Sequence, residues 1–309
     1  MRSVVVTGAT SMLGVSFINE CVAQGTKVLA LARENSKNLS RLSPSNLVEI
    51  VECDLSKMSE LSTKMAANQN FDCFYHFGWQ GTDKTERYDP QTQLENVQFT
   101  LDALNLAKYL GCKKFVGAGS QAEFGRATEK LSPNTPVNPE SAYGVAKYSA
   151  YKLSKILARK LKIEHVWVRV LSVYGPFDSP DTMIMTGIRQ LVEKNRPQYT
   201  KGQQLWDYLF SGDAGKAFYL IGEKGKDEAL YCLGSGIARP LSDYVKIMRD
   251  AVDPRLEVGL GEIEYPANQV MYLCADIENL TKDTGFVPET DFETGIKKTI
   301  RWYEEELSK

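Results

Sequence analysis

Tyr143 and Lys147 stand four positions apart in the stretch SAYGVAK, which runs from residue 141 to residue 147. If this stretch opens a helix, as the pattern of residues 148–161 indicates, both side chains lie on one helix face. A phenol with a pKa near ~10 is a poor base at neutral pH, but a lysine ammonium a few ångströms away favours the phenolate and lowers that pKa. The pair is therefore a candidate for proton transfer, although this spacing also arises by chance and needs support from the rest of the chain.

The composition is that of an ordinary globular protein. The 309 residues are 43% hydrophobic and 25% charged, which suits one large domain or two modest ones. The net charge of −2 gives no long-range attraction to nucleic acid or to an anionic membrane, so neither partner is expected. No apolar run approaches the ~20 residues that span a bilayer, and the chain enters its first apolar run without a charged leader, so we expect no signal peptide.

The cysteines and histidines argue against a metal site. Six cysteines are scattered without a close pair at metal-ligand spacing, and several fall in apolar runs. We interpret these cysteines as buried free thiols in a reducing compartment, and we therefore expect a cytoplasmic protein. With only His76 and His165 in the chain, a histidine-based metal site or catalytic triad is not expected either.

The N-terminus carries a candidate dinucleotide fingerprint. Residues 3–7 form a β-branched run that breaks into GATSMLG at positions 8–14, and a helical pattern follows. Gly8 would permit the tight turn, Gly14 would let helix and strand pack closely, and the amides at the helix start would take a pyrophosphate. Ser11 replaces the usual middle glycine, so either the serine is accommodated or the loop is displaced; an ordinary turn between strand and helix is the alternative.

The end of the second predicted strand, residues 27–32, bears on the choice of cofactor. A carboxylate near this point would bind the adenosine ribose 2′-hydroxyl and repel a 2′-phosphate. Here Ala32 is followed by Arg33, which with Ser36 or Lys37 would hold a 2′-phosphate. NADP(H) is therefore favoured, with NAD(H) possible if these cations are merely solvated.

Strands and helices alternate over roughly the first 170 residues, which predicts an α/β fold with a doubly wound parallel sheet and a dinucleotide at its carboxyl edge. Asp54 follows the third strand, where it would touch the adenine, and Gly78 follows the fourth, where the backbone would sit close to the cofactor. The alternation stops after residue 172. We therefore expect a Rossmann domain over residues 1–172, with 213–233 returning to it, and a second domain over 173–212 and 234–309.

In this order and spacing, the motifs resemble those of an extended short-chain dehydrogenase/reductase, of the branch acting on nucleotide sugars. The resemblance covers almost the whole chain and includes Arg169, YGP at 174–176, WDY at 206–208 with Asp213, and GFVP at 285–288 with Trp302. It implies a smaller C-terminal α+β substrate-binding domain and a nucleotide-sugar substrate. It also implies a homodimer that pairs through the helices of residues 93–110 and 143–161.

The resemblance also implies roles for individual residues. Tyr143 would exchange a proton with the sugar oxygen while C4 exchanges hydride with the nicotinamide, Ser120 would hydrogen-bond that oxygen, and Lys147 would bind the nicotinamide ribose. The implied cofactor contacts are Gly8, Thr10, Ser11, Met12, Leu13, Gly14, Arg33, Asp54, Leu55, Phe77, Gly78, Asn96, Tyr143 and Lys147. The implied substrate contacts are Gln121, Glu123, Ser172, Trp206 and Arg239.

Departures from the family pattern narrow the reaction. Gln121 and Ala122 stand where 4,6-dehydratases of this family carry Asp and Glu, and neither can act as the acid or base. Trp206 replaces the arginine that commonly grips the substrate diphosphate, leaving Arg189, Lys201 or Arg239 as candidates for that contact. We expect an NADP(H)-dependent 4-keto-(6-deoxy)hexose reductase. The alternatives are a 4-epimerase with tightly bound NAD and, from another class, a non-catalytic NADP-binding sensor or scaffold.

Overall fold

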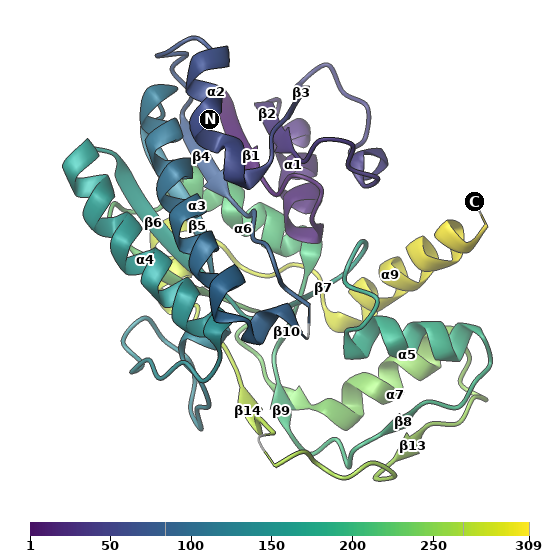
Figure 1. Ribbon diagram of the computed structural model, residues 1–309. Coiled ribbons are helices and arrows are strands. Elements are labelled where there is room, and N and C mark those ends of the chain that lie inside the picture. The colour runs from purple at the N-terminus through teal and green to yellow at the C-terminus, as the bar shows by residue number, and fades with distance from the viewer. Residues whose placement is uncertain (84, 268, 309) are drawn as a thin grey trace.

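The computed structural model describes residues 1–83, 85–267 and 269–308. Its centre is a seven-stranded sheet in which every paired neighbour is parallel, in the order β11-β6-β5-β4-β1-β2-β3 (Figure 1). The predicted doubly wound α/β fold is thus confirmed. The strands are β1 (Ser3–Thr7), β2 (Lys27–Ala32), β3 (Val48–Glu52), β4 (Cys73–His76), β5 (Lys114–Ser120), β6 (Glu164–Val170) and β11 (Leu230–Leu233).

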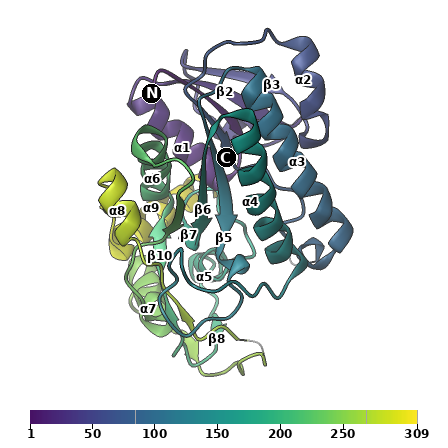
Figure 2. The ribbon, with the colours of Figure 1, turned by 90° about the vertical axis from the view of Figure 1, so that its left-hand side faces the viewer.

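Helices cover both faces of this sheet, which explains the nearly continuous apolar sequences of its inner strands. On β1, Val4 and Val6 join the core beneath α1 and α6, while Val5 points to the opposite core beneath α3. Figures 1 and 2 show the two helical layers on either side of the sheet. The layers consist of α1 (Met12–Ala23) and α6 (Ser211–Lys224) on one face, and α2 (Met58–Lys64), α3 (Pro90–Tyr109) and α4 (Ala142–Leu161) on the other.

The strand order reverses direction between β1 and β4, which are neighbours although β2 and β3 lie between them in the chain. The chain leaves β1 into α1 on one face, whereas the helix after β4 is α3 on the other. A crevice therefore opens beyond the carboxyl ends of these two strands, where open α/β sheets bind their ligands.

The C-terminal region packs around a core of its own beside the sheet, seen at the lower right of Figure 1. It contains α5 (Met183–Val192), α7 (Leu241–Val252) and α9 (Phe292–Leu307), whereas α8 (Glu278–Thr284) packs beside α6 on the core of the sheet (Figure 2). Short strands link it to the site: β7 (Ser172–Tyr174) pairs with β10 (Tyr208–Phe210), β9 (Leu205–Trp206) lies between β12 (Arg239–Pro240) and β14 (Tyr272–Leu273), and β8 (Gln198–Tyr199) pairs with β13 (Gly259–Leu260).

Helix α6 starts without a side-chain cap. Ser211 is already its first helical residue, and Phe210 before it makes no capping hydrogen bond with its side chain. The Asp213 carboxylate instead accepts hydrogen bonds from the backbone amides of Glu289 and Thr290. This acidic side chain therefore fastens the segment before α9 to α6.

Candidate active site

The glycine loop between β1 and α1 is shaped for close approach of a ligand. Gly8 has φ +65°, and a Cβ there would lie 2.6 Å from the amide nitrogen of Gly78 on the next strand end. A Cβ on Gly14 would lie 2.3 Å from the Gly8 carbonyl oxygen, so only glycine fits at either position. The arrangement leaves backbone, rather than side chains, facing the crevice.

Ser11 is accommodated in the loop as the N-cap of α1. Its hydroxyl accepts a hydrogen bond from the Gly14 amide at 3.1 Å and donates one to the Gly8 carbonyl at 2.8 Å. The first-turn amides of α1, those of Met12 and Leu13 among them, have no intrahelical partner and are suited to a pyrophosphate. The side chains of these two residues do not line the crevice, and that of Leu13 packs on the core.

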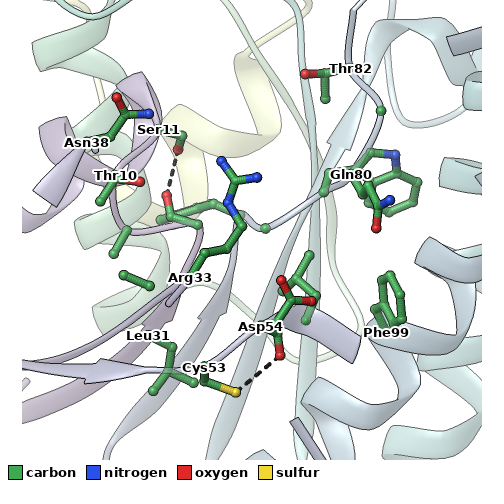
Figure 3. A pocket seen from close by; sticks show the side chains of 18 of the residues that line it. Thr10, Ser11, Leu31, Arg33, Asn38, Cys53, Asp54, Gln80, Thr82 and Phe99 are labelled. Atoms are coloured by element: carbon green, nitrogen blue, oxygen red, sulfur yellow. Dashed lines mark hydrogen bonds between the residues drawn. The ribbon is translucent and has the colours of Figure 1, made fainter. Parts of the chain in front are cut away.

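A cavity of about 900 Å³ runs from this loop along the carboxyl edge of the sheet. Arg33 extends from the end of β2 between the glycine loop and Asp54 (Figure 3). Asp54 also caps the short 3-10 helix η2 (Leu55–Lys57), since its Oδ1 accepts from the amide and hydroxyl of Ser56. Eight predicted cofactor residues line this cavity: Gly8, Thr10, Ser11, Arg33, Asp54, Leu55, Phe77 and Gly78.

Asn96 does not line that cavity and plays a different part from the one predicted. It is buried on α3, where its amide nitrogen donates to the carbonyls of Gln80 and Thr92 and its oxygen accepts from the Gln80 amide. With three of its hydrogen-bonding positions used in this way, Asn96 fixes the chain just after β4. Its contribution to the cavity is therefore the shape of the wall and not a direct contact.

The three predicted catalytic side chains come together at the end of β5 and the start of α4. Ser120 ends β5, and Tyr143 and Lys147 lie one turn apart on α4. All three are nearly inaccessible, with exposed fractions of 8%, 9% and 4%. Ser120 also opens the 3-10 helix η4 (Gln121–Glu123) by accepting a hydrogen bond from the Ala122 amide at 3.2 Å.

Lys147 is directed away from the tyrosine that it was expected to activate. Its Nζ donates to the Ala118 carbonyl at 2.7 Å and lies 3.6 Å from the centroid of the Trp79 indole, against 5.8 Å for the Tyr143 ring. Burial lowers the pKa of Lys147 from its ordinary 10.5 to about 7, and the Glu123 carboxylate only partly opposes this. The ammonium is thus easily deprotonated at neutral pH.

Among the described residues, Arg87 supplies the cation nearest to the Tyr143 ring. It belongs to the 3-10 helix η3 (Glu86–Tyr88), and its Cζ lies 4.1 Å from the centroid of Tyr143. Burial raises the pKa of Tyr143, while the charge of Arg87 and a hydrogen bond with Ser120 lower it. The pKa of Tyr143 stays raised overall, and the cation that opposes the effect of burial is Arg87 and not Lys147 as expected.

Trp79 and Arg87 were both missed as site residues. The region from 80 to 90 looked like a polar loop, and no motif distinguishes either residue. Their position gives the one available signal, since the segment follows a strand at the point where the sheet order reverses. Cationic and aromatic residues in such a segment are therefore candidates for the functional site.

The predicted substrate residues of the C-terminal region form a connected group. Ser172 stands two residues beyond Val170, the strand partner of Ser120, and its hydroxyl accepts from Trp206 Nε1 at 2.8 Å. Trp206 is in register with Arg239, whose guanidinium donates to Glu293 at 2.8 Å. Ser172 and Trp206 thus lie beyond the carboxyl end of β6, and neither they nor Arg239 line the cavity that starts at the glycine loop.

Glu123 cannot contact a substrate, contrary to the prediction. Its side chain is fully buried, and its carboxylate accepts from the Ser120 amide, Trp167 Nε1 and Arg169 Nε at 2.8–3.0 Å. The turn at η4 directs this carboxylate inward as half of a capping box. Glu123 therefore shapes the loop that carries Ser120. Gln121 is half-buried at the start of η4, and its predicted substrate contact stays a prediction.

Other classes of site find little support in the described residues. No group of three or more histidine, cysteine or acidic residues is arranged for a metal ion there, and the six cysteines are buried and free. Within residues 1–83, 85–267 and 269–308, no helix is both long and apolar enough to cross a membrane. The glycine loop, with its close backbone approach, instead fits a dinucleotide.

Known proteins resemble this chain over much or all of its length. A sequence profile described as the NAD dependent epimerase/dehydratase family matches residues 4–234. The dTDP-glucose 4,6-dehydratase of Shigella flexneri is 27% identical over 190 residues, 59% of this chain and 53% of that protein. The chain thus matches only about half the length of this curated relative.

Two solved structures share the fold of the whole chain. One is a UDP-N-acetylglucosamine 4-epimerase from Methanobrevibacter ruminantium in complex with UDP-N-acetylmuramic acid (TM-score 0.87, 20% identity, 99% of each chain). The other is a UDP-glucuronic acid 4-epimerase from Bacillus cereus in complex with NAD (TM-score 0.84, 18% identity, 99% of each chain). At these identities the likeness establishes the fold alone.

Proposed function

Because the chain belongs to the NAD-dependent epimerase/dehydratase family, we propose that it is an oxidoreductase that transfers hydride at C4 of a nucleotide-diphosphate sugar. The leading reaction is reduction of a 4-keto-(6-deoxy)hexose. The observation that carries this proposal is the meeting of Ser120, Tyr143 and Lys147 at the carboxyl edge of the sheet, where Trp79 of the cavity wall packs against Tyr143 and Lys147.

The chemistry assigned to the chain's own residues is proton transfer and alignment. When bound, a reduced nicotinamide supplies the hydride. Tyr143 gives its phenolic proton to the keto oxygen, so that hydride and proton together convert the carbonyl to a hydroxyl. The Ser120 hydroxyl hydrogen-bonds the same oxygen and stabilises the negative charge that develops there, and the Lys147 ammonium, on the same face of α4, orients the cofactor ribose.

Dehydration of the sugar fits this site poorly. The residues after Ser120 are Gln121 and Ala122, which cannot deliver and remove the protons that elimination of water requires. Glu123 is the next carboxylate along the chain, and it is locked in contact with Arg169 and Trp167. Reduction or epimerisation of C4 needs neither an extra acid nor an extra base and is therefore favoured.

NADP(H) is the proposed cofactor, and NAD(H) is the alternative. A cavity of about 610 Å³ at the end of β2 is lined by Arg33, Lys37 and Lys57 with Ser36, and also by the acidic residues Glu34 and Asp54. Three cations and a hydroxyl suit a 2′-phosphate. Lys57 lies 3.4 Å from Glu34, which leaves Arg33 and Lys37 as the main anion-binding groups.

Calorimetry with NADPH and NADH on the wild type and Arg33→Ala tests this cofactor proposal, with NADH as the internal control. We expect the substitution to weaken NADPH binding roughly 10- to 100-fold, the range for losing one charge-assisted hydrogen bond, and to leave NADH binding unchanged. Equal losses for both cofactors, or none, would contradict the assignment of a 2′-phosphate to this cavity.

The epimerase alternative is supported by the epimerases among the structures with this fold. An epimerase oxidises and re-reduces the same carbon, so it keeps its NAD, whereas a reductase exchanges its cofactor in every turnover. Nucleotide released by denaturing the purified protein distinguishes the two: stoichiometric NAD favours the epimerase. A non-catalytic sensor or scaffold remains the alternative of another class, and it would keep its function in Tyr143→Phe.

We also propose how the chain is organised and where it works. Residues 1–172 with 213–233 would form the cofactor-binding unit, supported by the pairing of β11 with β6, and 173–212 with 234–309 the substrate-binding unit. The free cysteines suit a cytoplasmic enzyme. The chain would pair as a homodimer through α3 and α4, whose exposed apolar residues are Leu94, Val145, Leu153 and Ile156.

A further inference from the structure

The segment between β4 and α3 brings two side chains onto the catalytic residues. The Trp79 indole lies over the Lys147 ammonium and meets the Tyr143 ring edge-on, with ring centroids 5.9 Å apart. The Arg87 guanidinium lies over that same tyrosine ring, 4.1 Å from its centroid. Aromatic rings attract cations to their faces, so both contacts are favourable.

The fold fixes this segment at several points, so the place of Arg87 is not an accident of a free surface side chain. Buried Gln93 on α3 accepts a hydrogen bond from Trp79 Nε1 at 2.9 Å. The same side chain donates to the carbonyls of Gly81 and Glu86, the latter directly before Arg87. A single side chain of α3 thus holds the segment at both ends.

Among the residues that the structure describes, no acidic side chain forms an ion pair with the guanidinium of Arg87, although Asp83 and Glu86 belong to the same segment. The Asp83 carboxylate accepts from the backbone amides of Thr85 and Glu86 instead. The charge of Arg87 therefore acts mainly on the ring beneath it.

The other charged groups around Tyr143 do not replace Arg87. Lys147 from α4 is committed to the Ala118 carbonyl and the Trp79 face. Glu123 from η4 is anionic and disfavours a phenolate, and its own charge faces Arg169. Of the groups that face Tyr143, Arg87 is thus the cation best placed to offset the cost of burying a phenolate.

We propose that Arg87 is a positioning residue for the catalytic tyrosine, fixing the ring of Tyr143 by stacking and stabilising its phenolate. This inference rests on the proposed function, in which Tyr143 exchanges a proton with the sugar oxygen. It deepens that function, because it assigns the stabilisation of the phenolate, which was expected from Lys147, to a residue on another element. Lys147 is then left to bind the cofactor.

A titration without cofactor or sugar tests the proposal directly. The near-ultraviolet absorbance of tyrosinate is followed against pH for wild type and Tyr143→Phe, and the difference isolates Tyr143. The same difference is taken in the Arg87→Gln background, over the pH range in which circular dichroism stays native. We expect Arg87→Gln to raise the titration midpoint of Tyr143 by roughly 1 pH unit or more.

Two further variants separate charge from other effects. Arg87→Lys keeps the charge and should retain part of the shift. Arg126→Gln removes an exposed arginine that is paired with Glu140 and should leave the midpoint unchanged. An unchanged midpoint in Arg87→Gln, an equal change in Arg126→Gln, or no titration of wild-type Tyr143 in the native range would overturn the proposal.

A kinetic measurement tells this failure apart from failure of the proposed function. In the direction of reduction the rate falls as Tyr143 loses its proton, so Arg87→Gln should move the alkaline limb of the pH–rate profile upward by the same amount as the titration. A shifted titration without any reduction of 4-keto sugars would contradict the proposed reductase function and support the proposed effect of Arg87 on Tyr143. Reduction with an unshifted titration would do the reverse.

Discussion

Tyr143 and Lys147 stand one helical turn apart on α4, yet their surroundings differ. The tyrosine ring lies against Arg87, whereas the ammonium faces Trp79 and a carbonyl of β5. Spacing along a helix therefore placed the two side chains on one face without revealing which cation acts on the phenol. Contacts from another element decide that.

The first prediction concerns the phenolic hydroxyl. Tyr143→Phe removes the proton donor and keeps the buried ring, so turnover should fall roughly 10²- to 10⁴-fold while the fold and NADPH affinity stay unchanged. Steady-state kinetics and calorimetry on the same preparation check both parts. Full activity in this variant would mean that another group moves the proton.

The second prediction is a pH dependence of stability caused by Lys147. Its pKa is about 7 in the folded protein and ordinarily 10.5, so between these values the unfolded chain binds a proton that the folded protein does not. Raising the pH through this window therefore stabilises the folded state, by up to about 1.4 kcal/mol per pH unit.

The matched comparison is with Lys147→Met, which lacks the titrating group. The free energy of unfolding of wild type minus that of the variant, from urea unfolding, should rise between about pH 7 and about pH 9. A difference that is flat or falls over this range would show that Lys147 is not buried as the structure has it.

Residues set by backbone geometry were the most predictable at this scale. Gly8 and Gly14 followed from the turn alone, and Ser11 turned out to cap α1 by the ordinary use of a serine hydroxyl. The substrate contact predicted for Glu123 was wrong because the sequence alone does not show which of the residues after Ser120 points into the core. Arg87 was missed because its partner, Tyr143, is far away in the chain.

At the scale of elements, the turn after β5 depends on a buried charge pair. Glu123 and Arg169 have side-chain exposures of 0% and 2%, and the carboxylate closes the capping box that presents Ser120. Burying such a pair has a large desolvation cost, but removing one partner leaves the other as an unpaired buried charge, which costs more. The turn is therefore sensitive to a single substitution.

The third prediction is that Glu123→Gln destabilises the fold by about 3 kcal/mol or more, because Arg169 loses its counter-charge. Urea unfolding measures the loss. Glu140→Gln is the matched control, since it breaks the exposed pair with Arg126 and should cost at most about 1 kcal/mol. Similar costs for the two variants would contradict the buried pairing.

Long elements with a clear period were predictable, and short ones were not. The apolar runs of residues 3–7 and 27–32 coincide with β1 and β2, and the periodic apolar patterns of residues 241–252 and 292–307 coincide with α7 and α9. Helix α2 and the two-residue strands β9, β12, β13 and β14 show no such pattern. Elements of that length hold too few residues to show a period and form only because their neighbours pack on them.

At the scale of the whole molecule, the exposed apolar residues of α3 and α4 carry the fourth prediction. The proposed homodimer buries Ile156, which is 63% exposed in the single chain. Ile156→Glu should therefore shift the mass measured by light scattering from dimer to monomer. Leu307→Glu, at a residue 61% exposed on α9, should leave the dimer intact; a monomeric wild type would refute the pairing.

The parallel sheet could be predicted because each of its strands has a recognisable apolar pattern of its own. Parallel strands must also be joined by crossover connections, which explains the alternating helices. How the C-terminal strands return to the site could not, because their pairings join residues far apart, such as Trp206 with Arg239. The sugar specificity could not be predicted for the same reason, since it depends on side chains that such pairings bring together.

The most direct test of the proposed reaction is isotope transfer. The protein is incubated with NADPH carrying deuterium at the transferable position and a panel of nucleoside-diphosphate 4-keto-6-deoxyhexoses, beside Tyr143→Phe. We predict a product with deuterium at C4, one NADP⁺ formed per product, and roughly 100-fold less of both, or lower still, in the variant over the same time. Products without deuterium, or interconversion of C4 epimers without net oxidation of NADPH, would contradict the reductase.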